Sequence, residues 1–524
     1  MRIGIDVGGT HTDAVILDGD AVIATTKQLT SADVITGVKH ALDAVLDDSA
    51  VDQRNIELVM IGTTQFTNAV IERRELAPTA AIRIGLPSGR GLPPMIDWPD
   101  DIAEAVGRHH HMISGGYLYD GRPLAPLDDA EIDAAIVDIH RAGLRNVAIS
   151  SAFAPANREP EEYVANKLRK AIPNAHVTLS HQFGRLGLVE RENAAILNTA
   201  LLPLAEKVVA SFLGAVAERG LECPIFVSQN DGTLMSADFV RQFPALTFAS
   251  GPTNSLRGAC RLTGLDDAIV VDIGGTTSDI GVLQHGFPRE SNVIVDVGGV
   301  RTNFRMPDVL AIGLGGGSLV EEGGKRIGPR SVGHRLVEEG RVFGGDTLTA
   351  TDIVVAGGHA DVGDAAAVAD IDPALVEQAQ ATMHEMLNRA IETMKPSEQA
   401  MPVVMVGGGS ILVSQSLAAA SVMHHPENAG VANAIGAAIA QIGGEAERMV
   451  SYRQSSRESA LESVTAEATR RAVAAGGDPA TIRVADVEET AVPYMDEGST
   501  RLRVKVVGDI ALSKNESSTS GGHE

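Results

Sequence analysis

The chain has 524 residues, of which 44% are hydrophobic and 21% are charged. This is the composition of a globular protein with roughly two to four domains, and it excludes wholesale disorder. A net charge of −25 repels nucleic-acid phosphates and anionic lipid, so we expect no nucleic-acid and no membrane partner. The two cysteines, Cys223 and Cys260, exclude a disulfide framework and a cysteine-based metal cluster carried by this chain alone. Asp6 interrupts what would be the apolar part of a signal peptide, so we expect a cytoplasmic protein.

An eight-residue pattern occurs near the N-terminus and again in the middle of the chain. Residues 6–13 are DVGGTHTD, and residues 272–279 are DIGGTTSD. An apolar, strand-like run precedes each copy and another follows it, which predicts a strand, a Gly-Gly-Thr turn and a second strand. A dinucleotide fingerprint or a Walker loop would lead from a strand into a helix, so the pattern disfavours both.

The two predicted hairpins are suited to binding phosphate. Glycines allow backbone N–H groups to face an anion, and hydroxyl groups add further donors. Asp6 and Asp272 each end a strand, where a carboxylate can hold a hydrated Mg²⁺ or orient a water. His11 can donate to a phosphate or serve only in packing, and we favour packing. The expected loop residues are Gly8, Gly9, Thr10, His11, Thr12 and Asp13 in the first hairpin, and Gly274, Gly275, Thr276, Thr277, Ser278 and Asp279 in the second.

Later glycine clusters are of two kinds. Residues 296–303 (DVGGVRTN) lack the threonine and the closing aspartate, and they predict an ordinary turn. The loop formed by Gly407, Gly408, Gly409 and Ser410 follows an apolar strand at 403–406, and we expect a small-residue helix after it, over 411–423. A second small-residue helix is expected over 432–438.

Two such hairpins, one in each half of a long α/β chain, resemble the actin-like ATPase superfamily. The resemblance implies two ribonuclease-H-like domains that hold ATP between paired phosphate loops, with ATP and Mg²⁺ as cofactors. It also implies that Asp6 and Asp272 are catalytic and bind the metal, and that residues 407–410 lie beside adenosine. The helix at 432–438 resembles the one that packs the two domains together.

Further segments, in order from residue 1 to about residue 445, resemble the hydantoinase A/oxoprolinase family. They are IGTTQFTNAVIERR at 61–74, SGGY at 114–117, DGR at 120–122, SGP at 250–252, IGLGGGS at 312–318, GPRS at 328–331 and TATD at 349–352. The resemblance implies a hydrolase that uses ATP and Mg²⁺ to open a cyclic amide, such as a hydantoin, 5-oxoproline or a lactam, by phosphorylating the amide oxygen. The alternatives are a small-molecule kinase with the same ATP site, and an ATP-driven activator or switch subunit.

The segment that begins at Thr63 allows two interpretations. A threonine here can start the following helix as an N-cap, or Thr63 and Thr64 can contact an anion or an amide carbonyl. The resemblance favours substrate contact, with Asn68 binding the amide. The chain shows no Ser/His/Asp order and no metal-ligand cluster for the hydrolytic step. Hydantoinase A subunits commonly work with a separate B subunit, so the resemblance implies a hydantoinase B-like partner and a hetero-oligomer.

The expected domain organisation follows from the two hairpins. We predict a first domain over residues 1–185 and a second over 186–445 that contains an inserted subdomain. A small C-terminal helix and β extension is expected over 446–512, and a disordered tail over 513–524. Many family members are longer, so we expect a shortened form.

Overall fold

The structure is a computed structural model that describes residues 1–8, 11–29, 34–47, 49, 51–118, 121–183, 187–291, 294–413, 415–439, 441–453, 455–492 and 499–511. Gly9, Thr10, Asp120 and the predicted tail at 513–524 lie outside the described residues. The chain forms two compact units. The larger comprises Met1–Gly232 and Ser236–Ala440, and the smaller comprises Thr233–Met235 and Gln441–Glu524.

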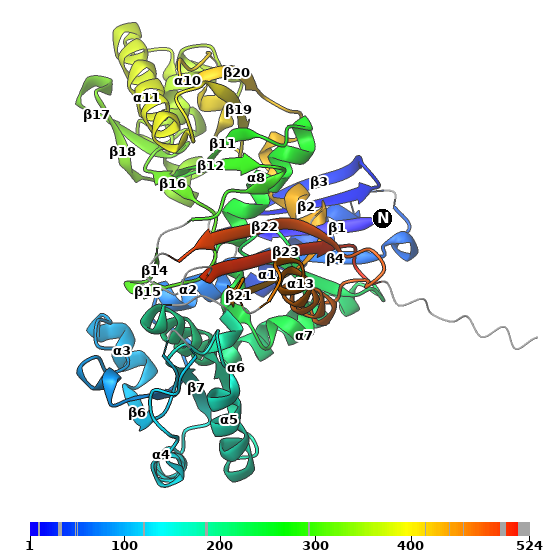
Figure 1. Ribbon diagram of the computed structural model, residues 1–524. Coiled ribbons are helices and arrows are strands. Elements are labelled where there is room, and N and C mark those ends of the chain that lie inside the picture. The colour runs from blue at the N-terminus through cyan, green and yellow to red at the C-terminus, as the bar shows by residue number, and fades with distance from the viewer. Residues whose placement is uncertain are drawn as a thin grey trace, which may run out of the picture. The chain divides into compact units, whose positions relative to one another are not determined.

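The first sheet of the larger unit is built around the N-terminal hairpin (Figure 1). Its strands, in the order in which they lie side by side, are β9 (Ile225–Ser228), β4 (Leu58–Thr63), β1 (Arg2–Val7), β2 (His11–Asp18) and β3 (Ala21–Leu29). The three strands β1 to β3 are antiparallel, whereas β4 and β9 continue the sheet in parallel. Helix α1 (Val34–Asp47) packs against β1 to β3. Strand β9 therefore completes this sheet from beyond residue 185, the predicted end of the first domain.

The second sheet repeats this arrangement around the second hairpin. Its strands are β13 (Phe287–Pro288), β12 (Ser278–Gln284), β11 (Ala268–Ile273), β19 (Met401–Val406) and β20 (Ala420–His424), and β16 (Val309–Ile312) also pairs with β12. Strands β11 and β12 are antiparallel, and β19 and β20 are parallel additions. Two sheets with this strand order confirm the predicted ribonuclease-H-like domains.

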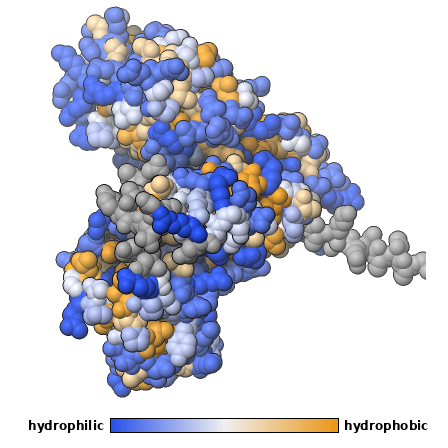
Figure 2. Space-filling view, in the orientation of Figure 1, coloured by the Kyte–Doolittle hydropathy of each residue, from blue (hydrophilic) through white to orange (hydrophobic). Residues whose placement is uncertain are grey.

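An apolar core holds the second sheet against helices α10 (Ala350–Ala356) and α11 (Pro373–Met394). Residues such as Ile353, Met383 and Leu387 are fully buried there against the strands. Figure 2 shows mainly hydrophilic residues on the visible surface of the lobe around α10 and α11, as expected for a helix layer with one buried face.

The expected helix at 411–423 is wrong. A short 3-10 turn at Ser410–Leu412 is followed by strand β20, which pairs with β19. Alanine favours a helix intrinsically, but hydrogen bonding to the edge of a buried sheet outweighs that preference here.

Helices α8 (Ser250–Thr263) and α12 (Ala432–Ile439) join the two sheets. Helix α12 packs on β1, β2 and β4, whereas α8 packs on β11, β12 and β19, and the two helices contact each other extensively. A Cβ atom at Gly258 would lie 1.8 Å from the Ala432 carbonyl oxygen, and one at Gly436 would lie 1.8 Å from the Asn254 carbonyl oxygen. The helices therefore meet backbone to backbone, as the small-residue pattern at 432–438 predicted.

A third lobe is inserted in the first half of the chain. It is a parallel sheet of β6 (His109–Ser114), β5 (Thr79–Leu86), β7 (Asn146–Ser151) and β8 (His176–Leu179), with helices α3 (Asp100–Val106), α4 (Asp129–Arg141) and α5 (Glu159–Ala171). The long helix α6 (Leu188–Glu218) packs against β5, β7 and β8 and also against α1. By length and composition α6 could cross a membrane, but more than half of its most apolar stretch is buried inside the protein.

The remaining elements of the larger unit are short. They are α2 (Gln65–Ile71), α7 (Ala237–Val240), α9 (Leu336–Glu339), the hairpin β14 (Val295–Val297) and β15 (Val300–Thr302), and the hairpin β17 (Ser318–Glu321) and β18 (Arg326–Ser331). In the β14–β15 hairpin, Gly298 and Gly299 both adopt positive φ, at 63° and 89°. This confirms the turn predicted at 296–303.

The smaller unit is an antiparallel sheet with one helix. Its strands β21 (Ile442–Ser451), β23 (Ser499–Gly508) and β22 (Arg483–Ala491) pair in that order, and β10 (Leu234–Ser236) pairs in parallel with the other side of β21. Helix α13 (Arg457–Ala474) packs on β21 and β23. The predicted helix and β extension is present, although β21 begins before the predicted start at residue 446.

Candidate active site

The strands of the two glycine hairpins pair in the same register. Asp6 lies opposite Asp13 in the β1–β2 pair, and Asp272 lies opposite Asp279 in the β11–β12 pair. The Gly8 N–H donates to the His11 carbonyl at 3.0 Å, and the Gly274 N–H donates to the Thr277 carbonyl at 2.9 Å. Directly paired residues project from the same face of a sheet. Each hairpin therefore presents two carboxylates beside its loop.

A glycine beneath each leading aspartate makes room for the carboxylate. A Cβ atom at Gly62, which lies beside Asp6 in the sheet, would be 2.1 Å from Asp6 Oδ1. A Cβ atom at Gly407, which follows β19, would be 2.2 Å from Asp272 Oδ1, and Gly407 has a φ of +82°. The predicted adenosine-side loop thus lies against the second hairpin, where the Gly409 N–H donates to the Ile273 carbonyl at 2.7 Å.

Two asparagines from the joining helices hold Asp6. Asn254 Nδ2 of α8 donates to Asp6 Oδ1 at 2.8 Å, and Asn433 Nδ2 of α12 donates to Asp6 Oδ2 at 3.0 Å. Burial raises the pKa of Asp6 to about 6, against the opposing effect of the Asn254 and Asn433 hydrogen bonds. Neither asparagine was predicted from the sequence. Their signal is an amide side chain in an otherwise small-residue helix, but nothing local pairs them with Asp6.

Asp272 and Lys27 link the two hairpins electrostatically. The Ser255 hydroxyl of α8 donates to Asp272 Oδ2, and burial raises the pKa of Asp272 while the Lys27 charge opposes that rise. Lys27 Nζ lies 2.5 Å from Asp13 Oδ1, and a Cβ atom at Gly408 would lie 3.9 Å from Lys27 Cε. Lys27, on β3, therefore stands between the first hairpin and the loop that supports the second. It is a functional candidate that the sequence analysis did not identify.

The predicted hydroxyl donors differ in how far their side chains are buried. Thr12 and Ser278 are fully buried, and the Ser278 hydroxyl donates to the Leu314 carbonyl at 2.6 Å. Both side chains are buried on their strands, and phosphate contact by Thr12 and Ser278 stays a prediction. Thr276 is half-buried and Thr277 is exposed, so both stay available. The neighbouring loop at 315–317 braces the second hairpin, since the Gly316 and Gly317 N–H groups donate to its carbonyls at 3.0 and 2.8 Å.

Thr63, Thr64 and Asn68 lie at the end of β4, next to the first hairpin. Thr63 is buried, and its hydroxyl accepts from the Gln65 N–H at 3.2 Å. The N-cap residue of α2 is Thr64, whose side chain makes no capping hydrogen bond. The Thr64 hydroxyl donates to the Val7 carbonyl at 3.3 Å, and the exposed Asn68 donates to Thr64 Oγ1 at 3.4 Å. Substrate contact by Thr63, Thr64 and Asn68 stays a prediction.

His11 is half-buried, and its surroundings disfavour the charged imidazole. Burial is the main cause that lowers the pKa of its imidazole, and the positive charge of Lys27 lowers it further. A neutral imidazole is a weaker partner for phosphate than a charged one. This favours the packing interpretation of His11.

The chemistry of the donor set fits a hydrated Mg²⁺. The charge of Asp272 contributes to the raised pKa of Asp6, and burial is the main cause that raises the pKa of both. Mg²⁺ is bound through one or two carboxylates together with waters and substrate phosphates, rather than by a full protein cage. The described part of the chain contains no group of three or more His, Cys, Asp or Glu side chains that could enclose an ion.

Asp279 differs from its counterpart Asp13 in lacking a cation, and this has a consequence for stability. Burial, followed by the charge of Asp272, raises the pKa of Asp279 from 3.8 to about 7. Because the folded-state pKa lies above the unfolded-state value, ionisation destabilises the fold progressively as the pH rises from about 4 to 7. Asp279→Asn is therefore expected to raise the melting temperature of the ligand-free protein above pH 7, and to leave it nearly unchanged below pH 4. Melting curves of both proteins in chelator across this range check the sign, and a variant less stable at every pH would contradict it.

Comparisons with known proteins agree with the arrangement of the hairpins. Residues 2–172 match the model of the hydantoinase/oxoprolinase N-terminal region, and residues 191–362 match the hydantoinase/oxoprolinase model. The chain is 27% identical over 388 residues to caprolactamase subunit alpha of Pseudomonas jessenii, covering 68% of this chain and 54% of that protein. It is 23% identical over 366 residues to an uncharacterised protein of Methanocaldococcus jannaschii, covering 63% and 53%. The chain thus spans about half the length of these curated relatives.

Two solved structures share the fold. The ATP-dependent caprolactamase from Pseudomonas jessenii matches with a TM-score of 0.76 at 19% identity, and nucleotide-free acetone carboxylase matches with a TM-score of 0.65 at 17% identity. Each match covers 98% of this chain and 88% of the other. Together with the two family models, which span both halves of the larger unit, they lead to one conclusion: this chain belongs to the hydantoinase/oxoprolinase family.

Proposed function

We propose that the protein catalyses the ATP- and Mg²⁺-dependent opening of a cyclic amide, beginning with phosphorylation of the amide oxygen. The observation that carries this proposal is the pair of matching glycine hairpins, each with an aspartate of raised pKa beside its loop. Such a site suits a nucleotide triphosphate with its cation, because phosphates need backbone donors and the cation needs carboxylates. Membership of the family, and a caprolactamase subunit among the relatives, support an amide substrate.

The proposed reaction balances in two stages. The amide oxygen attacks the γ-phosphorus and ADP leaves; water then adds to the activated carbon, the ring C–N bond breaks, and the nitrogen takes a proton. The acyl phosphate that results is hydrolysed by a second water to carboxylate and inorganic phosphate. Phosphorylation is needed because an unstrained amide carbon is a poor electrophile, and phosphoryl transfer depends on positioning and charge stabilisation rather than on a covalent protein nucleophile.

Different residues contribute to different parts of this reaction, according to where they lie. Backbone N–H groups of the two loops, with Thr276 and Thr277, orient the phosphates, and Lys27 opposes the charge that develops during transfer. Mg²⁺ held through Asp6 and Asp272 would neutralise phosphate charge when bound. Asn254 and Asn433 keep the Asp6 carboxylate in place. Thr64 and Asn68 lie beside the first hairpin, where the amide would approach.

We further propose that a second subunit completes the hydrolytic step. The name of the relative caprolactamase subunit alpha implies a partner in that protein. In this chain, the described residues around the hairpins supply groups for phosphoryl transfer, and none forms a hydrolytic triad with them. A hydantoinase B-like protein is the partner that the family membership favours.

One assay separates the proposed activity from its alternatives. The purified chain is incubated with Mg·ATP and hydantoin, 5-oxoproline, a thiohydantoin or ε-caprolactam, with and without a co-expressed B-like subunit. ADP, phosphate and the ring-opened product are measured together. Equal amounts of ADP, phosphate and opened ring are expected.

A stable phosphorylated small molecule would instead identify a kinase, and ATP turnover without any altered compound would identify a switch. Full ring opening by the chain alone would contradict the need for a partner.

The close fit of Asp6 over Gly62 gives a steric test of the site. Gly62→Ala is expected to lower ATP turnover by about 100-fold, because its Cβ would displace the Asp6 carboxylate, and a shift of about 1 Å can cost that much. Overpacking should also lower stability by about 1–3 kcal/mol. Gly214→Ala on α6 is the matched control, since a Cβ there meets no atom within 4 Å. Steady-state ATPase rates and melting temperatures of both variants decide the matter, and an unimpaired Gly62→Ala enzyme would refute the placement of Asp6.

A further inference from the structure

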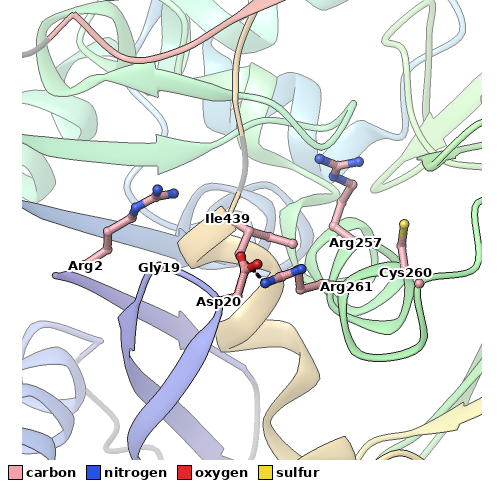
Figure 3. A pocket seen from close by; sticks show the side chains of 8 residues that line it. Arg2, Gly19, Asp20, Arg257, Cys260, Arg261 and Ile439 are labelled. Atoms are coloured by element: carbon pink, nitrogen blue, oxygen red, sulfur yellow. Dashed lines mark ion pairs between the residues drawn. The ribbon is translucent and has the colours of Figure 1, made fainter.

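A cavity of about 430 Å³ lies at the opposite end of strand β1 from Asp6. Its walls come from the start of β1, the β2–β3 turn, and the ends of helices α8 and α12, and its charged lining is Arg2, Asp20, Arg257 and Arg261 (Figure 3). Arg2 and Asp6 are four positions apart along the strand, a span of about 13 Å. The cavity is therefore separate from the hairpin loops, although its size is typical of small-molecule sites, which are ~300–1,000 Å³.

The positive charge of this cavity is only partly neutralised. Arg261 forms an ion pair with Asp20, and Figure 3 shows Arg2 and Arg257 on opposite sides of that pair. Arg2 has no hydrogen-bond or ion-pair partner that the structure describes. Arg257 donates through Nη1 to the Gly286 carbonyl, and its guanidinium lies 4.3 Å from the centre of the Phe287 ring.

Arg257 keeps unused donor capacity. Its buried Nε finds no hydrogen-bond acceptor among the described residues. Burial lowers the pKa of Arg257, and the negative charges of Asp231 and Asp266 only partly offset this lowering of the pKa. Three guanidinium groups thus line one cavity, and among them only Arg261 forms an ion pair that the structure describes.

We propose that this cavity binds a small molecule that carries a phosphate group, with Arg2 and Arg257 as its anion-binding side chains. Guanidinium groups match phosphate oxygens with paired N–H donors, and they do so more specifically than a lysine would. The site contacts β1 of the first sheet and α8, the helix that packs on the second sheet. It is independent of the nucleotide and amide sites proposed above.

Cys260 lines the cavity and provides a local probe of occupancy. The experiment uses the full chain with Cys223→Ser, so that Cys260 is its only thiol. The rate of Cys260 alkylation by neutral iodoacetamide is measured by mass spectrometry in inorganic phosphate, in pyrophosphate, and in sodium chloride of the same ionic strength. Either phosphate compound is expected to slow alkylation several-fold relative to chloride. Arg2→Gln and Arg257→Gln should each abolish the protection, whereas Arg54→Gln, which removes an exposed surface charge, should preserve it.

Two outcomes would overturn the proposal. Equal alkylation rates in phosphate, pyrophosphate and chloride would show that neither anion occupies the cavity. Protection that persists in Arg2→Gln would show that phosphate acts from elsewhere, for example from the hairpin loops. Arg2→Gln is the decisive variant because Arg2 has no described partner to lose, so it should fold normally even where Arg257→Gln disturbs the packing on Phe287. The ring-opening assay is unaffected by either result, so the two proposals fail separately.

Discussion

Asp272→Ala is expected to abolish ATP hydrolysis, with turnover falling by about 10³-fold or more, because the variant loses the carboxylate that we propose holds the cation in the second hairpin. The fold should survive. Burial raises the pKa of Asp272, so its ionised form is held in the protein at a cost, and alanine removes that cost together with the Ser255 hydrogen bond. The measurement is the steady-state ATPase rate at saturating Mg·ATP, together with the melting temperature in chelator.

The matched control for this variant is Asp296→Ala. Asp296 precedes a Gly-Gly turn in the same sequence context, but it is exposed and its carboxylate accepts only from the Gly299 N–H of its own turn. Its replacement should leave ATP turnover close to that of the wild type. Wild-type turnover in Asp272→Ala at unchanged stability would remove the second hairpin from the active site.

Lys27→Met is expected to lower ATP turnover by about 10²–10³-fold, since it removes the cation placed between the two hairpins. It should also destabilise the protein by about 1–3 kcal/mol, because buried Asp13 loses its partner while Lys27 itself is one-third exposed. Loss of activity alone could therefore reflect a disturbed hairpin. Lys39→Met, which breaks an exposed ion pair with Glu218, controls for the removal of a lysine.

A second substitution separates the two effects of Lys27. Lys27→Met combined with Asp13→Asn removes the unpaired carboxylate, so stability should return towards that of the wild type while turnover stays low. Melting temperatures and ATPase rates of the two single variants and the double variant complete the cycle. Restored turnover in the double variant would mean that Lys27 only neutralises Asp13 and takes no part in phosphoryl transfer.

The sequence by itself determined the two hairpins and their pairing. The repeat at 6–13 and 272–279 is local, because a strand, a tight glycine turn and a second strand need only neighbouring residues to form. The register Asp6–Asp13 and Asp272–Asp279 follows from that local geometry. The ordered set of further motifs then placed the chain in its family, and the family models confirm this.

Only the tertiary structure decided which side chains complete the site. Asn254 and Asn433 lie 248 and 427 positions away from Asp6 in the chain, and no local pattern assigns an amide to a carboxylate at that separation. Lys27 is one polar residue in an alternating strand, and its role appears only when β3 is placed beside the second half of the molecule. The wrong helix expected over 411–423 has the same origin. Part of that alanine-rich segment became strand β20 because β19 offered it hydrogen bonds. Backbone turns are fixed by short-range sterics, whereas burial and side-chain partners depend on contacts that exist only after the two sheets have packed through α8 and α12.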